Sequence, residues 1–167
     1  VNFDLSHAGK GKSHGWFFFS CYNTEQANSL LEVNASQRDK DFIMAVNWKK
    51  AEEYIKAGKG KIEKTKYVHN TWNDETHSGK SEIKNEVLVL DAMAMKDICY
   101  LMPCPKSPHG CDVDPTGEYI VGSGKLAALI PVFSFDKMVK AIGKKDYEGD
   151  YEGIPVLKYN SVLHGEV

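Results

Sequence analysis

Six histidines are spread along the 167-residue chain, and imidazole is a common ligand for copper, zinc and iron. None of them forms a His-x-x-x-His or His-x-His pair, so spacing alone does not predict a locally built mononuclear metal site. His109 stands out because it lies between Pro108 and Gly110. Pro108 fixes its own backbone φ, and Gly110 lets other groups approach closely, so the imidazole is presented from a stiff segment. From the residues alone two interpretations stay open for His109: a structural histidine, which is the commoner case, and a metal ligand.

Several other motifs fail when their spacing is checked. Gly11–Ser13 and Gly79–Ser81 resemble the end of a phosphate-binding loop, which requires a further glycine five positions before its second glycine. Ser6 and Asp74 occupy those positions, so no phosphate-binding loop is predicted. The segment Asp112–Gly117 resembles the start of a calcium loop but has neither the third acidic position nor the closing glutamate.

The four cysteines are Cys21, Cys99, Cys104 and Cys111. Their gaps are irregular and no Cys-x-x-Cys pair occurs, so neither a zinc ribbon nor a thioredoxin-like redox site is predicted. Free cysteine usually behaves as a small buried apolar residue, which is the interpretation preferred here. A disulfide stays open as the alternative.

Charge and hydropathy indicate which partners to expect. The formal net charge is −2, and the lysines between residues 49 and 66 are interleaved with Glu52, Glu53 and Glu63, as on a solvated surface. A nucleic-acid-binding domain usually carries a basic patch, so no nucleic acid is predicted as a partner. No apolar run approaches the ~20 residues that a membrane-spanning helix needs, so no membrane span is predicted either.

Short apolar and aromatic runs separated by turn residues predict an all-β fold with short helical insertions. We expect strands at Gly15–Tyr22, Asp41–Trp48, Thr65–His69, Glu86–Asp91, Ile98–Met102 and Leu129–Phe135. We expect helices at Lys49–Ala57 and Lys137–Ile142, the second capped by Asp136. The rest of Gly58–Lys84 is polar and is expected to be rich in turns.

The sharpest local pattern is a hairpin that follows His109. Gly110–Asp114 and Glu118–Val121 flank a Pro-Thr-Gly sequence that fits a type I turn. Strands at such spacing are typical of a sandwich, a barrel or a propeller, and the order strand, turn, strand, link, strand favours propeller blades. Roughly two blades of about 40–50 residues would fit the length. No two internal repeats align, so the pattern alone does not establish a propeller.

Two of these segments carry a resemblance to a known family. Ser20–Glu25 and Pro103–Val121 closely resemble stretches of nitrous oxide reductases, which are copper enzymes. The likeness continues through Gly122–Leu126, and Asp39–Trp48 is also similar. The resemblance covers nearly the whole chain, and its motifs are long and unusual.

The resemblance implies an architecture and an activity. Members of this family are periplasmic homodimers, in which each subunit joins a seven-bladed β-propeller to a C-terminal cupredoxin domain. They reduce nitrous oxide to dinitrogen and water at a tetranuclear copper–sulfide cluster, using electrons that cytochrome c or a cupredoxin delivers through a dinuclear copper site. Residues 1–167 are then expected to be a fragment of the N-terminal propeller domain, without the cupredoxin domain and inactive when alone.

The resemblance also implies site residues. His109 matches a ligand of the copper cluster in the family's Pro-His-Gly motif, which would also make it a catalytic residue. Five positions match ligands of a calcium ion: Tyr22, Glu25, Val33, Asp39 and Ser107. Val33 stands where the family has methionine, a harmless change if the metal binds the backbone carbonyl, and Ser107 stands where many members have asparagine. His164 falls near another family ligand, but its surroundings differ from that motif, and it is interpreted as a surface residue.

Two other functions stay open. The first is a non-catalytic periplasmic propeller module that binds proteins or calcium, with His109 purely structural. The second is a periplasmic electron-transfer or metal-chaperone domain. Flanking sequence would distinguish them, because a His-His pair upstream and a Cys-x-x-x-Cys cupredoxin motif downstream would favour the enzyme.

Overall fold

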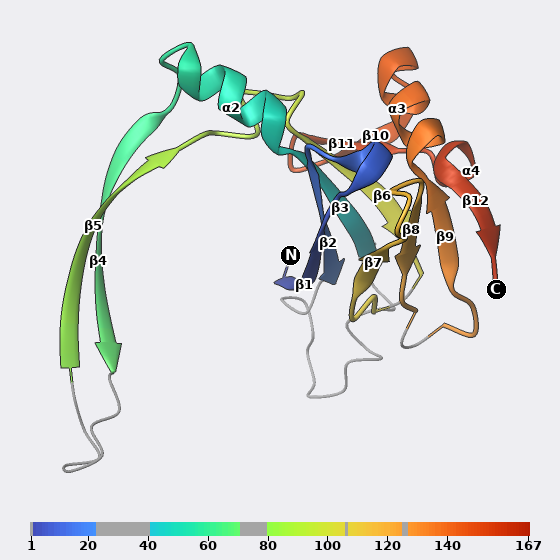
Figure 1. Ribbon diagram of the computed structural model, residues 1–167, viewed down its shortest axis with the longest axis horizontal. Coiled ribbons are helices and arrows are strands. Elements are labelled where there is room, and N and C mark those ends of the chain that lie inside the picture. Colours follow the sequence, from blue (N-terminus) through green and yellow to red (C-terminus); the bar gives the residue numbers. More distant parts are fainter. Residues whose placement is uncertain (1, 23–40, 71–79, 106, 125–126) are drawn as a thin grey trace. The chain divides into compact units, whose positions relative to one another are not determined.

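A computed structural model describes residues 2–22, 41–70, 80–105, 107–124 and 127–167 (Figure 1). These residues form a mostly β structure with short helices, as the sequence predicts. The chain divides into two compact units, residues 1–51 with 92–167, and residues 52–91. None of the helices in the described ranges is long and apolar enough to cross a membrane.

The first unit contains a six-stranded sheet with the order β1-β2-β3-β6-β11-β10. Its strands are β1 (Asn2–Ala8), β2 (Trp16–Tyr22), β3 (Asp41–Asn47), β6 (Cys99–Cys104), β11 (Ile154–Leu157) and β10 (Tyr147–Tyr151). The pairs from β1 to β6 are antiparallel, whereas β11 joins β6 in parallel. The expected strands in β2, β3 and β6 are confirmed, while β1, β10 and β11 were not predicted because their sequences are short or mostly polar.

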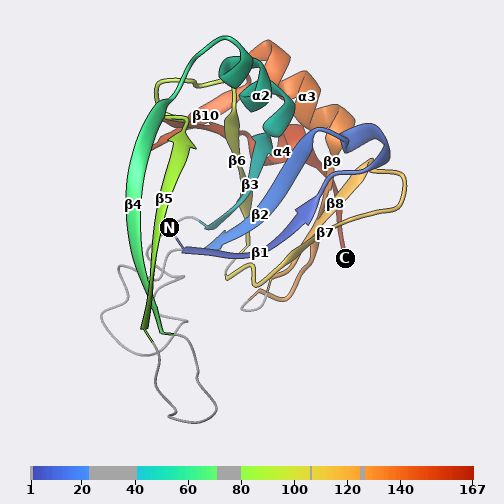
Figure 2. The ribbon, with the colours of Figure 1, turned by 60° about the vertical axis from the view of Figure 1, so that its left-hand side comes forward.

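A second, four-stranded sheet in the same unit has the order β12-β9-β8-β7 and is antiparallel throughout. Its strands are β7 (Cys111–Val113), β8 (Tyr119–Gly122), β9 (Pro131–Ser134) and β12 (Leu163–Glu166). The predicted hairpin is confirmed, because Cys111 pairs with Gly122 and the Gly117 N–H donates to the Asp114 carbonyl at 3.0 Å. Strands β1 and β7, one from each sheet, lie next to each other (Figure 2).

The two sheets and a helix share one apolar core. Strand pairing places Phe18, Ala45 and Tyr100 side by side on one face of the six-stranded sheet. The core is completed by Ile43, Met102, Cys111, Val113, Ile120, Phe133, Phe135, Met138, Ala141, Leu157 and Val162. A fully buried large apolar side chain stabilises a fold by about 1.5–3 kcal/mol, so this core is the main source of the unit's stability.

Helix α3 (Phe135–Lys144) follows β9 and contributes Phe135, Met138 and Ala141 to that core. Its N-cap is Ser134, whose Oγ accepts from the Lys137 N–H at 3.2 Å. The expectation that Asp136 caps the helix is therefore wrong, because the helix begins one residue before Asp136. Asp136 lies in the first turn instead, where its charge favours the helix dipole.

The second unit consists of most of helix α2 (Trp48–Lys56) and the hairpin of β4 (Lys61–Asn70) and β5 (Lys80–Val89). The helix confirms the expectation, and the expected strands Thr65–His69 and Glu86–Asp91 fall within or overlap β4 and β5. The expected turns are wrong where these strands extend further, and residues 71–79 lie outside the described residues. Ten residue pairs run from Lys61 opposite Val89 to Asn70 opposite Lys80. Polar residues form these strands because pairing supplies partners across the ladder, such as Lys64 Nζ and Glu86 Oε1 at 3.2 Å.

A short 3-10 helix, η1 (Gly11–Ser13), fastens the β1–β2 connection to the β7–β8 turn. The Lys12 N–H donates to the Thr116 carbonyl at 3.0 Å. The Lys12 ammonium binds Asp136 Oδ2 at 2.7 Å and Glu118 Oε2 at 2.9 Å, and these two carboxylates raise its pKa.

The close approach of η1 to the β7–β8 turn requires glycine at position 117. Gly117 has φ 76°, and a Cβ at this residue would collide with the Lys10 carbonyl oxygen. Only glycine allows the turn and η1 to approach this closely.

We predict that Gly117→Ala destabilises the folded state by about 1–3 kcal/mol, because it adds both a backbone strain and a collision. Denaturant unfolding and hydrogen exchange at the Lys12 amide would measure the effect. Gly143→Ala is the matched control, since Gly143 lies in α3 with no atom within 4 Å of its built Cβ, and it should be neutral or slightly stabilising. Equal stability of the two variants would contradict this account.

Candidate functional site

The connection from β6 to β7 carries His109 from one sheet to the other. We refer to residues 107–110 as the His109 loop. Ser107 and Pro108 are buried completely, whereas His109 is exposed. The base of the loop is thus part of the protein interior, and the imidazole is presented at the surface.

A hydrogen bond to a buried carboxylate fixes the first residue of this loop. The Ser107 N–H donates to Asp41 Oδ2 at 2.7 Å. Asp41 is the first residue of β3 and is only 4% exposed. Ser107 has φ 55°, a left-handed conformation that a residue with a side chain seldom adopts. The bond therefore holds a backbone conformation that is unfavourable by itself.

Two further hydrogen bonds fix the last residue of the loop. The Gly110 N–H donates to Ser123 Oγ at 2.8 Å, and the Ser123 N–H donates to the Gly110 carbonyl at 3.0 Å. Ser123 directly follows β8, so the hairpin that begins after the loop also holds the loop in place. His109 lies between two anchored ends, which supports the stiffness predicted from Pro108 and Gly110.

Sequence reasoning missed both anchoring side chains. The sequence does contain a signal for the role of Asp41, because this residue begins a strand and is followed by apolar residues. In the structure the side chains of those residues are buried. A carboxylate in such a position calls for a hydrogen-bond partner. Ser123 had no comparable signal, since a serine between two glycines is typical of any loop.

The other predicted site residues are described less fully. Tyr22 is the last residue of β2 and pairs with Asn2, and its side chain lies outside the described part of the structure. Glu25, Val33 and Asp39 lie wholly outside the described residues. Of the predicted ligands, the structure describes the surroundings of Ser107 and His109, which are two residues apart in the His109 loop, and the calcium and copper assignments stay predictions.

His164 lies in β12 and is exposed, which confirms its interpretation as a surface residue. Its ring centroid is 4.7 Å from that of Tyr119. It therefore packs against a side chain of β8, with β9 lying between the two strands in the sheet.

Within the described ranges, no three His, Cys, Asp or Glu side chains are grouped so that they could hold a metal ion. The His109 loop accordingly offers one imidazole, which fits a single copper ligand and not a complete copper site. Ser107 offers hydroxyl and carbonyl oxygens, the type of donor that calcium prefers.

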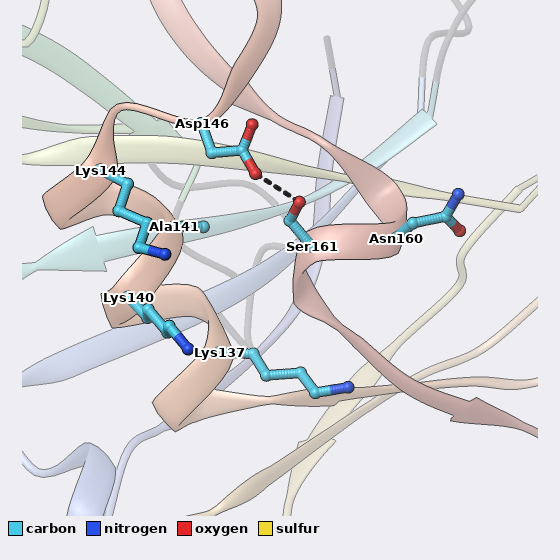
Figure 3. Close-up of a pocket in the computed structure, with 7 residues that line it drawn as sticks. All are labelled: Lys137, Lys140, Ala141, Lys144, Asp146, Asn160 and Ser161. Carbon is cyan, nitrogen blue, oxygen red and sulfur yellow. Dashed lines mark hydrogen bonds between the residues drawn. The ribbon is translucent and has the colours of Figure 1, made fainter.

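A hollow of about 260 Å³ lies between α3 and α4 (Tyr159–Val162), and none of the predicted site residues line it (Figure 3). Asp146 at its rim accepts from Ser161 Oγ at 2.6 Å and binds Lys158 Nζ at 2.6 Å, contacts that lower its pKa. Across the hollow, the Lys137 ammonium donates to the Leu163 carbonyl at 2.8 Å. These contacts hold α4 against α3, so the hollow is accounted for by helix packing.

All four cysteines are free thiols, and Cys21, Cys99 and Cys111 are buried. This confirms for these three the interpretation as small buried residues, while Cys104 is half-buried. Burial raises the pKa of Cys21 and of Cys111 to about 12 and that of Cys99 to about 11. Burial, with the nearby Asp41 carboxylate as a smaller contribution, also raises the pKa of Cys104. Because thiolate is the reactive form, these raised pKa values lower the reactivity of the thiols near neutral pH.

The described residues thus define a mostly β protein in which a histidine is presented from a short, anchored connection between two sheets. No protein-family model matches the chain.

The chain is similar to nitrous-oxide reductases. It is 26% identical to the enzyme of Pseudomonas fluorescens over 137 residues, which is 82% of this chain and 18% of that protein. It is 28% identical to the enzyme of Stutzerimonas stutzeri over 121 residues, which is 71% of this chain and 16% of that protein. The resemblance seen in the motifs is confirmed as a distant similarity, and the chain spans less than a fifth of the length of these relatives.

We predict that thiol reagents modify the cysteines slowly in the folded protein. With a pKa of about 12 instead of 9.0, Cys21 and Cys111 hold about a thousandfold less thiolate at pH 8, and thiolate is the reacting form. Iodoacetamide labelling followed by mass spectrometry, with and without denaturant, would measure this difference. Labelling of Cys21 in native protein as fast as in denaturant would contradict the burial described here.

Proposed function

We propose that residues 1–167 belong to the N-terminal propeller domain of a periplasmic nitrous oxide reductase, and that His109 is a ligand of its tetranuclear copper–sulfide cluster. The observation that carries the proposal is the presentation of His109: an exposed imidazole on a loop with a buried base and two anchored ends. The same loop lies in the segment that resembles the family's ligand motif.

The strand order supports the propeller. Strands β1-β2-β3-β6 form one antiparallel series and β7-β8-β9-β12 form another, each following the order of the chain. The chain passes from β6 at one side of the first series to β7 at the edge of the second, and β1 lies next to β7. Propeller blades are four-stranded sheets arranged around a central channel. In this arrangement β1 and β7 are the inner strands of two adjacent blades, while β4-β5 and β10-β11 are insertions.

In this assignment His109 would enter the central channel just before an inner strand begins. One nitrogen of a neutral imidazole would bind copper, and the other would donate its N–H to an acceptor, as ligand histidines usually do. The cluster, when bound, would supply electrons to nitrous oxide and yield dinitrogen and water. The role of this chain is to hold the imidazole in a fixed direction and position.

A calcium ion is part of the same proposal. Its ligands would be Tyr22, Glu25, Val33, Asp39 and Ser107. Support comes from the buried position of Ser107 and from the oxygen donors that these residues share. The ion would connect the segment after β2 to the base of the His109 loop. Electrons would come from cytochrome c or a cupredoxin through a dinuclear copper site outside this chain, in a homodimer.

We predict that His109→Ala in the full-length protein lowers nitrous oxide reduction by more than about 100-fold, because even residues that only support a metal ligand contribute 10–100-fold. Copper content, the visible spectrum of the cluster and turnover should fall together. His164→Ala is the matched control, since His164 is also exposed but is not a predicted ligand. Normal turnover in His109→Ala would exclude His109 as a ligand of the cluster, whereas a wild-type protein that does not reduce nitrous oxide would favour a non-catalytic propeller module or a metal-chaperone domain.

We also predict that the isolated chain does not assemble the cluster, because its described residues provide one imidazole at the proposed site and a multinuclear cluster needs several ligands. Copper and sulfide reconstitution followed by elemental analysis would test this. Stoichiometric cluster formation by the isolated chain would contradict the prediction.

A further inference from the structure

The buried carboxylate of Asp41 is the most unusual polar group near the His109 loop. Burying a charge is unfavourable unless hydrogen bonds or opposite charges compensate for it. Asp41 is 4% exposed and is followed in β3 by the fully buried Phe42 and Ile43. An apolar side chain would be the ordinary choice at such a position, so a specific contact must account for the carboxylate.

A contact of this kind is made with the backbone of the His109 loop. Asp41 lies opposite Cys104, the last residue of β6, so its carboxylate lies where the chain leaves the sheet. Three residues later, Ser107 directs its N–H back to Asp41 Oδ2, at 2.7 Å. A hydrogen bond from an amide to a carboxylate is short and strong, and this one is also shielded from water.

The hydrogen bond between Asp41 and Ser107 stabilises one backbone conformation of Ser107, and this conformation sets the direction of the chain that follows. Ser107 has φ 55°, and a serine without this contact would prefer an extended or right-handed conformation. Pro108 has a fixed φ and a completely buried ring, so the direction chosen at Ser107 passes to His109 with little remaining freedom. The backbone hydrogen bond between Gly110 and Ser123 then fixes the other end.

We propose that Asp41 is a positioning residue for His109: by holding Ser107 in its left-handed conformation, it sets the direction in which the imidazole approaches the copper cluster. This inference rests on the proposed function. Asp41 is not among the predicted calcium ligands, and its role here is carried by its contact with the loop backbone.

The test uses the full-length protein with Asp41→Ala and Asp41→Asn. Asparagine keeps an acceptor oxygen without the charge, so it should preserve part of the effect. Asp150→Ala is the matched control, because Asp150 Oδ1 also accepts a backbone N–H, from Gly153 at 3.0 Å, in the β10-β11 turn. Hydrogen exchange in metal-free protein would measure the exchange rates of the Ser107 and Gly110 amides. Absorption and electron paramagnetic resonance spectra would follow the cluster in the copper-loaded protein.

We expect Asp41→Ala to speed exchange at Ser107 roughly tenfold or more, because a hydrogen bond to a charged group is lost. The cluster spectrum should shift or the copper content should fall, Asp41→Asn should lie between Asp41→Ala and wild type, and Asp150→Ala should match wild type. If Asp41→Ala does not fold, Asp41→Asn decides the question. Wild-type exchange at Ser107 or a wild-type cluster spectrum in a folded Asp41 variant would overturn the proposal.

The result separates this inference from the proposed function. If the wild-type protein holds no copper cluster, or if His109→Ala keeps one, the proposed function fails and this inference fails with it. If His109→Ala loses the cluster while both Asp41 variants retain a normal one, only the role of Asp41 is wrong.

Discussion

The apolar core shared by the two sheets and α3 is the constraint on which the first unit depends. Each sheet has an apolar face that must be removed from water, and residues such as Phe18 and Phe133 bury the two faces together. Because β6 belongs to the first sheet and β7 to the second, the connection from β6 to β7 must cross between the sheets. The His109 loop is that crossing, so its position follows from the packing of the sheets.

Within this crossing, hydrogen bonds and not apolar packing hold the backbone in place. Asp41 and Ser123 each come from a strand end or a loop next to a strand, and each bonds to the backbone of the His109 loop. The strands that carry them are anchored in the core. A rigid core thus supplies the fixed points from which a short loop presents one exposed side chain, which is the arrangement that a metal ligand needs.

The sequence motifs that resemble nitrous oxide reductases include the His109 loop and the hairpin that follows it. In the structure, both ends of this loop are anchored by hydrogen bonds. The chain corresponds to less than a fifth of those enzymes. In the proposed assignment, a complete copper cluster would take its other ligands from outside the described residues, and His109 would be the ligand that this chain provides.

The sequence by itself determined the features that depend on neighbouring residues. It predicted strands β2, β3 and β6, helix α2, the Asp114–Gly117 turn and the stiffness around His109, because alternation and turn chemistry act over a few residues. The tertiary structure alone decided which side chains meet across the chain. Asp41 is 66 residues from Ser107, and the polar ladder of β4 and β5 depends on cross-strand partners. Such contacts follow from which strands pair and in which register, and the local sequence does not contain that information.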